Sequence, residues 1–203
     1  FIYINFIDKD IIFFCKYKMT TKQSSLGPKS FKKLKKINGV SVASTYCGLK
    51  KNKKDDLVLI RFDQSSSIHG VFTKSKVPGA PIVWNKSIIK KGKVSAILIN
   101  SGNANVFNGK KGEIAIKKIL KNLSVKMNIK EDEIYLASTG VIGEPLDPKK
   151  IIKKIPFFLK NLSNESKCWF KAANAIRTTD TFPKLDSEII NLPNKKKIFI
   201  NGI

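Results

Sequence analysis

The chain has 203 residues, of which 42% are hydrophobic, so it can bury a sizeable core and is too apolar to be disordered. Its net charge of +24 would ordinarily favour a nucleic acid or an anionic membrane as partner. All but two of the 39 basic residues are lysines spread over nearly every segment, whereas recognition of phosphates and bases relies on arginine, so we expect no nucleic-acid and no membrane partner.

The N-terminal stretch is apolar but resembles a targeting signal only superficially. Asp8, Lys9 and Asp10 interrupt it, it is too short to span a bilayer, and no small-residue cleavage site follows. Because Met19 looks like the natural start, we expect residues 1–18 to be upstream sequence read in frame. We therefore divide the chain into a leader and basic lead-in, residues 1–38, and a globular part, residues 39–203.

Strands dominate the first half of the globular part. Gly39–Tyr46 suits a short strand, and Asp56–Phe62 is apolar nearly throughout, as a strand covered on both faces would be. Gly70–Thr73 and Ile82–Trp84 are shorter strand candidates on either side of a Pro and Gly turn cluster. Val94–Ile99 is the clearest strand of the chain.

Helical patterns enter in the second half. Gly112–Leu123 carries an apolar stripe at helical spacing with lysines opposite, which predicts a helix packed on a sheet. Asp147 followed by Pro148 is typical of an N-cap and a first helical position. The further predicted elements are a strand at Ile134–Ala137, helices at Pro148–Ile155 and Lys167–Ala175, and a final strand at Lys197–Ile200. Alternating strands and helices predict an α/β or α+β fold.

The cysteines argue against a metal site and against a disulfide framework. Cys15, Cys47 and Cys168 are odd in number and widely spaced, and His69 is the one histidine of the sequence. We interpret His69 as a loop or strand residue and expect no metal. Lone thiols suit a reducing compartment, so we expect a cytoplasmic protein, with a mitochondrial matrix left open.

Three small-residue segments rich in hydroxyl or amide groups follow apolar runs, and we interpret them as loops that bring backbone N–H groups close to a ligand. They are Asn100–Asn105, Ser138–Gly143 and Thr178–Lys184. Within the second, a threonine hydroxyl beside a glycine N–H offers two adjacent donors for a developing oxyanion. The alternative is an ordinary glycine turn with a capping threonine.

From about Gly39 to Ile203 the chain resembles the N-terminal part of the bifunctional ornithine acetyltransferase family, also called glutamate N-acetyltransferase. The resemblance rests on four segments in the family's order, Gly70–Thr73, Asn100–Asn105, Ala137–Leu146 and Ala175–Lys184. It implies a mixed α/β layered sandwich that is incomplete without a β chain. It also implies transfer of acetyl from N-acetylornithine to glutamate in arginine biosynthesis, through an acetyl-threonine enzyme made by self-cleavage of a precursor.

The resemblance also implies roles for individual residues. Thr139 and Gly140 match the family's oxyanion-hole pair. Thr178 matches a threonine that contacts the substrate, with Thr179 as the next choice. For Asn100–Asn103 we expect only a part in the architecture of the site, because these residues could equally brace neighbouring loops.

The sequence stops before the family's nucleophilic threonine, the lysine preceding it and the β chain. We therefore expect these 203 residues alone to be inactive, to expose an apolar edge and to be poorly soluble. The resemblance implies no bound cofactor, acetyl-CoA as an optional co-substrate and an α2β2 heterotetramer. The alternatives are a catalytically inactive homologue or interaction protein and, least favoured, a basic nucleic-acid-binding module.

Overall fold

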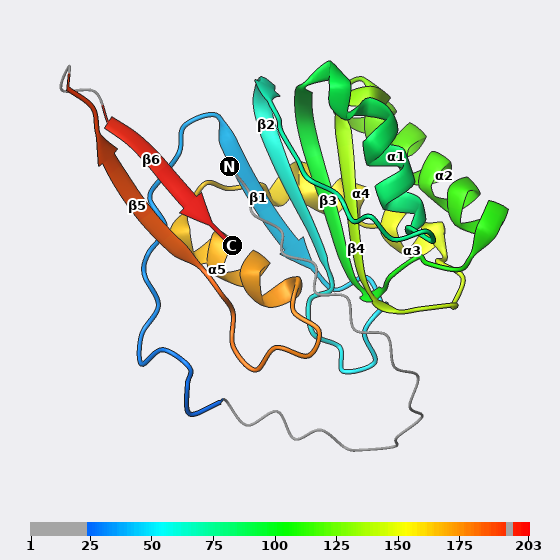
Figure 1. Cartoon of the computed structure of the whole chain (residues 1–203), viewed down its shortest axis with the longest axis horizontal. Helices are drawn as coiled ribbons and strands as arrows, with labels where there is room; N and C mark the ends of the chain where they lie inside the picture. The colour runs from blue at the N-terminus through cyan, green and yellow to red at the C-terminus, as the bar shows by residue number, and fades with distance from the viewer. Residues whose placement is uncertain (1–23, 194–196) are drawn as a thin grey trace.

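The computed structural model describes residues 24–193 and 197–203, and its centre is a four-stranded sheet (Figure 1). The sheet has the order β1-β2-β3-β4. Neighbouring strands run antiparallel except β3 and β4, which are parallel. The strands are β1 (Val40–Thr45), β2 (Leu57–Ser67), β3 (Lys93–Asn103) and β4 (Ile134–Val141). The expected start at Met19 and the leader 1–18 lie outside the described residues.

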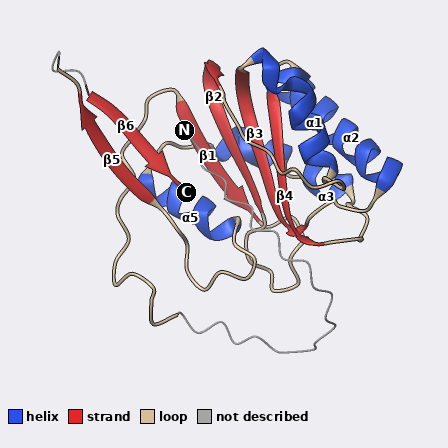
Figure 2. Cartoon of the chain, viewed as in Figure 1, coloured by secondary structure: helices blue, strands red, loops and turns tan. Residues whose placement is uncertain are grey.

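Helices cover both faces of this sheet (Figure 2). Helices α2, α3 and α4 share a core with one face, and α5 packs on the other together with the lead-in residue Leu34. A separate two-stranded antiparallel hairpin is hydrogen-bonded to the lead-in, where the Lys35 N–H donates to Ser187 and Asn201. The helices are α1 (Ala80–Ile88), α2 (Gly109–Met127), α3 (Pro148–Ile152), α4 (Ile155–Asn161) and α5 (Ser166–Ala175), and the hairpin strands are β5 (Asp186–Asn191) and β6 (Lys197–Gly202).

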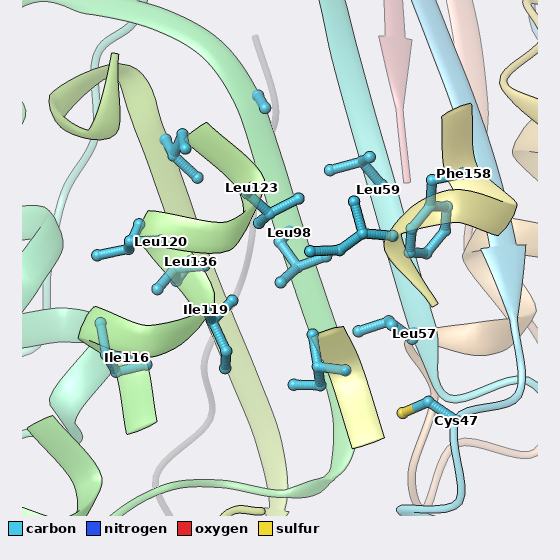
Figure 3. Close-up of a cluster of buried hydrophobic side chains, with 14 of the residues drawn as sticks. Cys47, Leu57, Leu59, Leu98, Ile116, Ile119, Leu120, Leu123, Leu136 and Phe158 are labelled. Carbon is cyan, nitrogen blue, oxygen red and sulfur yellow. The ribbon is translucent and has the colours of Figure 1, made fainter. Parts of the chain in front are cut away.

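Strand β2 contains the unbroken apolar run Leu57–Ile60, whose successive side chains enter cores on opposite faces of the sheet. Leu57 and Leu59 point to the core under α2 and α4, whereas Val58 and Ile60 point to the core under α5. All four side chains are fully buried. Figure 3 shows Leu57 and Leu59 beside Phe158 of α4, with Leu98 of β3 lying between them and the leucines of α2. The prediction that this strand is covered on both faces is confirmed.

The two outer strands of the sheet, β1 and β4, have hydrogen-bonding partners for some of their outward-facing backbone groups. At β4, the Asn85 side chain of α1 donates to the Leu136 carbonyl at 2.8 Å and accepts from the Leu136 N–H at 3.0 Å. At β1, Val42 exchanges two backbone hydrogen bonds with Ser163. Exposed apolar side chains are found on the hairpin, at Ile189, Ile190, Ile198 and Phe199, and also at Val141 at the end of β4.

Most predicted elements are confirmed, and three differ for identifiable reasons. Ile82–Trp84 is not a strand but the middle of α1, which has Pro81 in its first turn. Gly70–Thr73 has no regular structure. The helix predicted over Pro148–Ile155 ends at Ile152, and α4 follows it with Pro156 in its first turn, where a missing N–H costs nothing. Strand β5 was not predicted.

No helix in the described ranges, 24–193 and 197–203, combines the length and the apolar character needed to cross a membrane.

Candidate functional site

Two of the three sequence motifs are neighbouring strand ends rather than loops. Asn100–Asn103 closes β3 and Ser138–Val141 closes β4, and the two run in parallel register. In that register Ser101 pairs with Thr139, and Gly102 pairs with Gly140. The carboxyl ends of neighbouring parallel strands are a common location for ligand sites in α/β proteins.

The paired glycines are required by the close approach of three backbone segments. Gly140 has φ +130°, and a Cβ there would lie 2.4 Å from the carbonyl carbon of Gly102. Gly102 has φ +106°, and a Cβ on it would lie 2.9 Å from the carbonyl group of Leu49. No larger residue fits at either position without displacing a backbone. The glycines of the motifs therefore stack the loop before β2, strand β3 and strand β4 in direct contact.

Thr139 lies on the α5 side of the sheet, by two independent observations. Side chains alternate along a strand, and Tyr135 and Ala137 of β4 both belong to the core under α5. Its register partner Ser101 donates its hydroxyl to the carbonyl of Ala175, the last residue of α5, at 2.5 Å. Thr139 is half-buried, and its hydroxyl takes part in none of the side-chain hydrogen bonds found among the described residues.

The third motif begins at the end of α5, three residues from that contact. Arg177 folds the turn by donating to the Asp180 carbonyl at 3.0 Å and to the Asn174 side chain at 2.8 Å. The Thr181 hydroxyl accepts from the backbone of Ser24, whereas Thr178 and Thr179 are exposed. The structure thus brings Thr178 to the same end and the same face of the sheet as Thr139.

The asparagines of the first motif brace the site. Asn100 donates to the Asn103 carbonyl at 2.8 Å and accepts from the Ser138 hydroxyl at 2.5 Å. Asn103 donates to the Glu144 carbonyl at 2.9 Å and accepts from the Asn105 N–H at 2.8 Å. Asn100 and Asn103 are both buried, and their polar atoms are used in tying the two strand ends and the following loop together. A purely architectural role is what these contacts favour.

Two residues of the site, Asp56 and Lys50, were missed from the sequence. Asp56 is fully buried, and its carboxylate accepts three backbone N–H bonds from the loop before β2. The Lys50 ammonium donates to the Ala175 carbonyl at 2.7 Å, and burial lowers the pKa of Lys50 to about 8 although Asp56 acts in the opposite direction. Nothing in the sequence separates Lys50 from the other lysines, so no signal could have found it.

Cys47 lies beside this carboxylate and stays a thiol. Its backbone N–H donates to Asp56 at 2.7 Å. Burial, reinforced by the negative charge of Asp56, raises the pKa of the Cys47 thiol well above its ordinary value. A buried thiol of this kind is a poor nucleophile.

A cleft of about 660 Å³ lies away from these motifs, between the start of β3 and the end of α2. Arg61, Ser95 and Glu133 form a hydrogen-bonded chain in its wall, with Arg61 donating to the Ser95 carbonyl and Ser95 donating to Glu133. None of the residues lining it belongs to the three motifs. The candidate site at the carboxyl ends of β3 and β4 is therefore separate from this cleft.

The fold and this site define an α/β layered protein whose site lies at the carboxyl ends of two parallel strands. Residues 41–203 match the family model described as the ArgJ family, and the chain belongs to this family. The arginine biosynthesis bifunctional proteins ArgJ of Bartonella henselae and Agrobacterium fabrum are 38% and 40% identical to it over 185 residues. Each alignment covers 91% of this chain and 44% of the relative, so the chain spans less than half the length of these relatives.

Solved structures agree with this assignment. The arginine biosynthesis bifunctional protein ArgJ of Bacillus halodurans matches with a TM-score of 0.75 at 29% identity, over 81% of this chain and 85% of that one. The ornithine acetyltransferase of Mycobacterium tuberculosis, solved with ornithine, matches with a TM-score of 0.72 over 81% of this chain and 87% of that one. At 23% identity the second likeness shows the fold alone. The predicted fold class, a mixed α/β sandwich of the ornithine acetyltransferase type, is confirmed.

Proposed function

We propose that this chain contributes the oxyanion-stabilising part of an acetyltransferase of arginine biosynthesis, which transfers acetyl from N-acetylornithine to glutamate. The observation that carries the proposal is the register of β3 and β4. It sets Thr139 beside Ser101, and the Ser101 hydroxyl bonds to the helix end from which the Thr178 motif begins. Membership of the ArgJ family supports the reaction class.

In this proposal the Thr139 hydroxyl and the Gly140 N–H donate to the oxyanion of the tetrahedral intermediate. Donors fixed in advance act where charge develops, and removing one such donor typically costs about 10²–10³ in kcat. The packed glycines provide that fixation, since Gly140 rests directly on the backbone of Gly102. Thr178 contacts the substrate from the end of α5.

The remaining parts of the proposal come from the family resemblance. The nucleophilic threonine, and with it the β chain of an α2β2 heterotetramer, belongs to the portion of the relatives that this chain does not span. Acetyl-CoA is an optional second acetyl donor, and the cytoplasm is the proposed compartment. Residues 1–203 by themselves are expected to transfer no acetyl group.

The test is a fused protein in which residues 1–203 are joined to the segment of the Agrobacterium fabrum relative that follows its matched region. We expect glutamate-dependent deacetylation of N-acetylornithine by the fused protein and none by residues 1–203 alone. Thr139→Ala should lower kcat by about 10²–10³. Thr73→Ala, whose hydroxyl only accepts a local bond from the Ser75 N–H, serves as the matched control and should leave kcat within about twofold.

Two outcomes contradict the proposal. A folded but inactive fused protein, assayed beside the active Agrobacterium fabrum enzyme, would favour the inactive homologue. An active fused protein in which Thr139→Ala and Thr73→Ala behave alike would remove Thr139 from the oxyanion hole.

A further inference from the structure

A buried carboxylate shapes the loop that precedes β2. Asp56 accepts backbone N–H bonds from Cys47 at 2.7 Å, Leu49 at 2.6 Å and Lys50 at 2.9 Å. Its own carbonyl accepts from the Ser101 N–H of β3 at 2.8 Å. One residue therefore fixes the loop and joins it to the motif strand, and a buried carboxylate satisfied by three N–H groups holds a single conformation.

The same loop lies directly on the candidate site. The carbonyl group of Leu49 would be 2.9 Å, and the nitrogen of Lys50 3.1 Å, from a Cβ placed on Gly102. Gly102 is the register partner of Gly140. A shift of the loop is therefore transmitted by backbone contact to the proposed oxyanion donor.

The carbonyl of Ala175 is the point at which three distant segments meet. It belongs to the last turn of α5, where carbonyls have no partner within the helix and carry partial negative charge. It accepts from the Lys50 ammonium at 2.7 Å and from the Ser101 hydroxyl at 2.5 Å. Lys50 also donates to the Asp55 carbonyl at 3.1 Å, so its ammonium bridges the loop and the helix end.

The partial burial of the Lys50 ammonium disfavours its charge. Four charged groups act on it: Asp55 and Asp56 favour its charge, whereas Lys54 and Arg177 oppose it. Burial is nevertheless the largest influence and lowers its pKa to about 8. A half-buried lysine is retained where its donors hold something in place, and here two of them hold the Asp55 carbonyl and the origin of the Thr178 motif.

We propose that Lys50, oriented by Asp56, is a positioning residue that holds the end of α5 against β3 and thereby sets Thr178 relative to Thr139 and Gly140. The proposal rests on the proposed function for its catalytic consequence only. The structural part of the proposal, that Lys50 anchors residues 176–182, does not depend on which reaction the protein catalyses.

The first experiment measures that anchoring in the 203-residue chain by hydrogen exchange and mass spectrometry. In Lys50→Met we expect peptides covering residues 176–182 to exchange about tenfold faster, with β3 and β4 unchanged. Ser101→Ala removes the other donor to the same carbonyl and should accelerate the same peptides. Lys54→Met, a neighbouring exposed lysine, is the matched control and should leave them unchanged.

Unchanged exchange of residues 176–182 in Lys50→Met would overturn the proposal. An equal acceleration throughout the sheet would overturn it too, because that result describes a general loss of stability. Lys50→Arg, which keeps a cation and donors at the helix end, should restore most of the protection.

The second experiment measures kinetics in the fused protein. Lys50→Met should raise the KM for N-acetylornithine by about tenfold with a smaller fall in kcat, and Lys50→Arg should return KM most of the way. Equal falls in kcat and kcat/KM at unchanged KM would contradict a role through Thr178. If the unsubstituted fused protein is inactive, the proposed function fails while the exchange result still decides the anchoring.

Discussion

The carboxyl end of β3 and the hairpin β5–β6 differ sharply in packing within one small chain. At the strand ends Ser101 is fully buried and Asn103 is 5% exposed, and their polar groups are paired. On the hairpin Ile190 and Phe199 are each 45% exposed. A buried region whose polar groups are all paired can hold hydrogen-bond donors in fixed positions. An exposed apolar hairpin instead offers a surface on which another apolar surface can pack.

The largest expected effect is at the glycine stack. Gly140→Ala should destabilise the chain by more than about 3 kcal/mol, because its Cβ would overlap the backbone of Gly102 at an unfavourable φ. Gly143→Ala has a positive φ of +82° but no neighbour within 4 Å, and should cost about 1 kcal/mol. Urea denaturation measures both, and equal losses would show that the strand ends are not tightly packed.

The second effect concerns the buried carboxylate. Asp56→Asn should cost about 2 kcal/mol, because an amide replaces one acceptor oxygen by a donor and leaves a backbone N–H unpaired in the interior. Asp55→Asn, at a partly exposed residue whose carboxylate accepts only from the Ser44 hydroxyl, should cost well under half as much. A similar loss of stability in both variants, again measured by urea denaturation, would show that the Asp56 carboxylate does not hold the loop before β2 in place.

The third effect compares two lysines, one bonded next to each region, by the pH dependence of unfolding. The pKa of Lys50 is lowered to about 8 by burial, so between pH 8 and 10.5 the unfolded state binds more protons and Lys50 adds stability as pH rises. Unsubstituted chain should therefore gain stability relative to Lys50→Met over this range. Parallel urea midpoints for the two proteins at pH 8 and pH 10 would refute it.

Lys32, on the hairpin side, should behave in the opposite sense. Hydrogen bonds to Asp186 and Glu188 raise its pKa, so its contribution is present at lower pH and is lost as pH rises through that raised value. Between pH 8 and 10, the unsubstituted chain should therefore gain no stability relative to the Lys32→Met variant. Since this ion pair is exposed, its effect should also shrink in high salt.

The smallest effect on stability belongs to the hairpin. Ile190→Thr combined with Ile198→Thr should change the free energy of unfolding by no more than about 0.5 kcal/mol per residue. The same double variant should clearly reduce self-association, measured by light scattering or sedimentation, because it removes exposed apolar area. A large loss of stability would show that the hairpin is part of the core.

The sequence pattern was sufficient for the main sheet and for α2 and α5. Val94–Ile99 and Gly112–Leu123 have strand and helix periodicities that local residues determine, and the structure extends each by a few residues. Ile82–Trp84 is β-rich but short, and Pro81 together with packing against β4 decides for a helix. Strand β5 is largely exposed and contains Asp186 and Glu188, so its sequence does not predict a strand. It is a strand because β6 pairs with it.

The threonine and the glycines of the candidate site could be picked out from the sequence, but Asp56, Lys50 and the geometry of the site could not. Glycine next to threonine could be found from the sequence, but their placement within strands depends on a register between β3 and β4 that only tertiary pairing fixes. The Asp56 carboxylate accepts from N–H groups six to nine positions away, whereas the Lys50 ammonium donates to a carbonyl 125 positions away, a contact that no local pattern encodes. Long-range hydrogen bonds of this kind come from the fold as a whole.

The asparagine of α1 has a consequence for assembly. By occupying both the donor and the acceptor of Leu136, Asn85 terminates the sheet at β4 as a capping group ends a growing polymer. The Trp84 indole occupies the Ile134 carbonyl two residues earlier in the same way. An additional strand approaching β4 therefore finds the Ile134 carbonyl and both backbone groups of Leu136 already bonded.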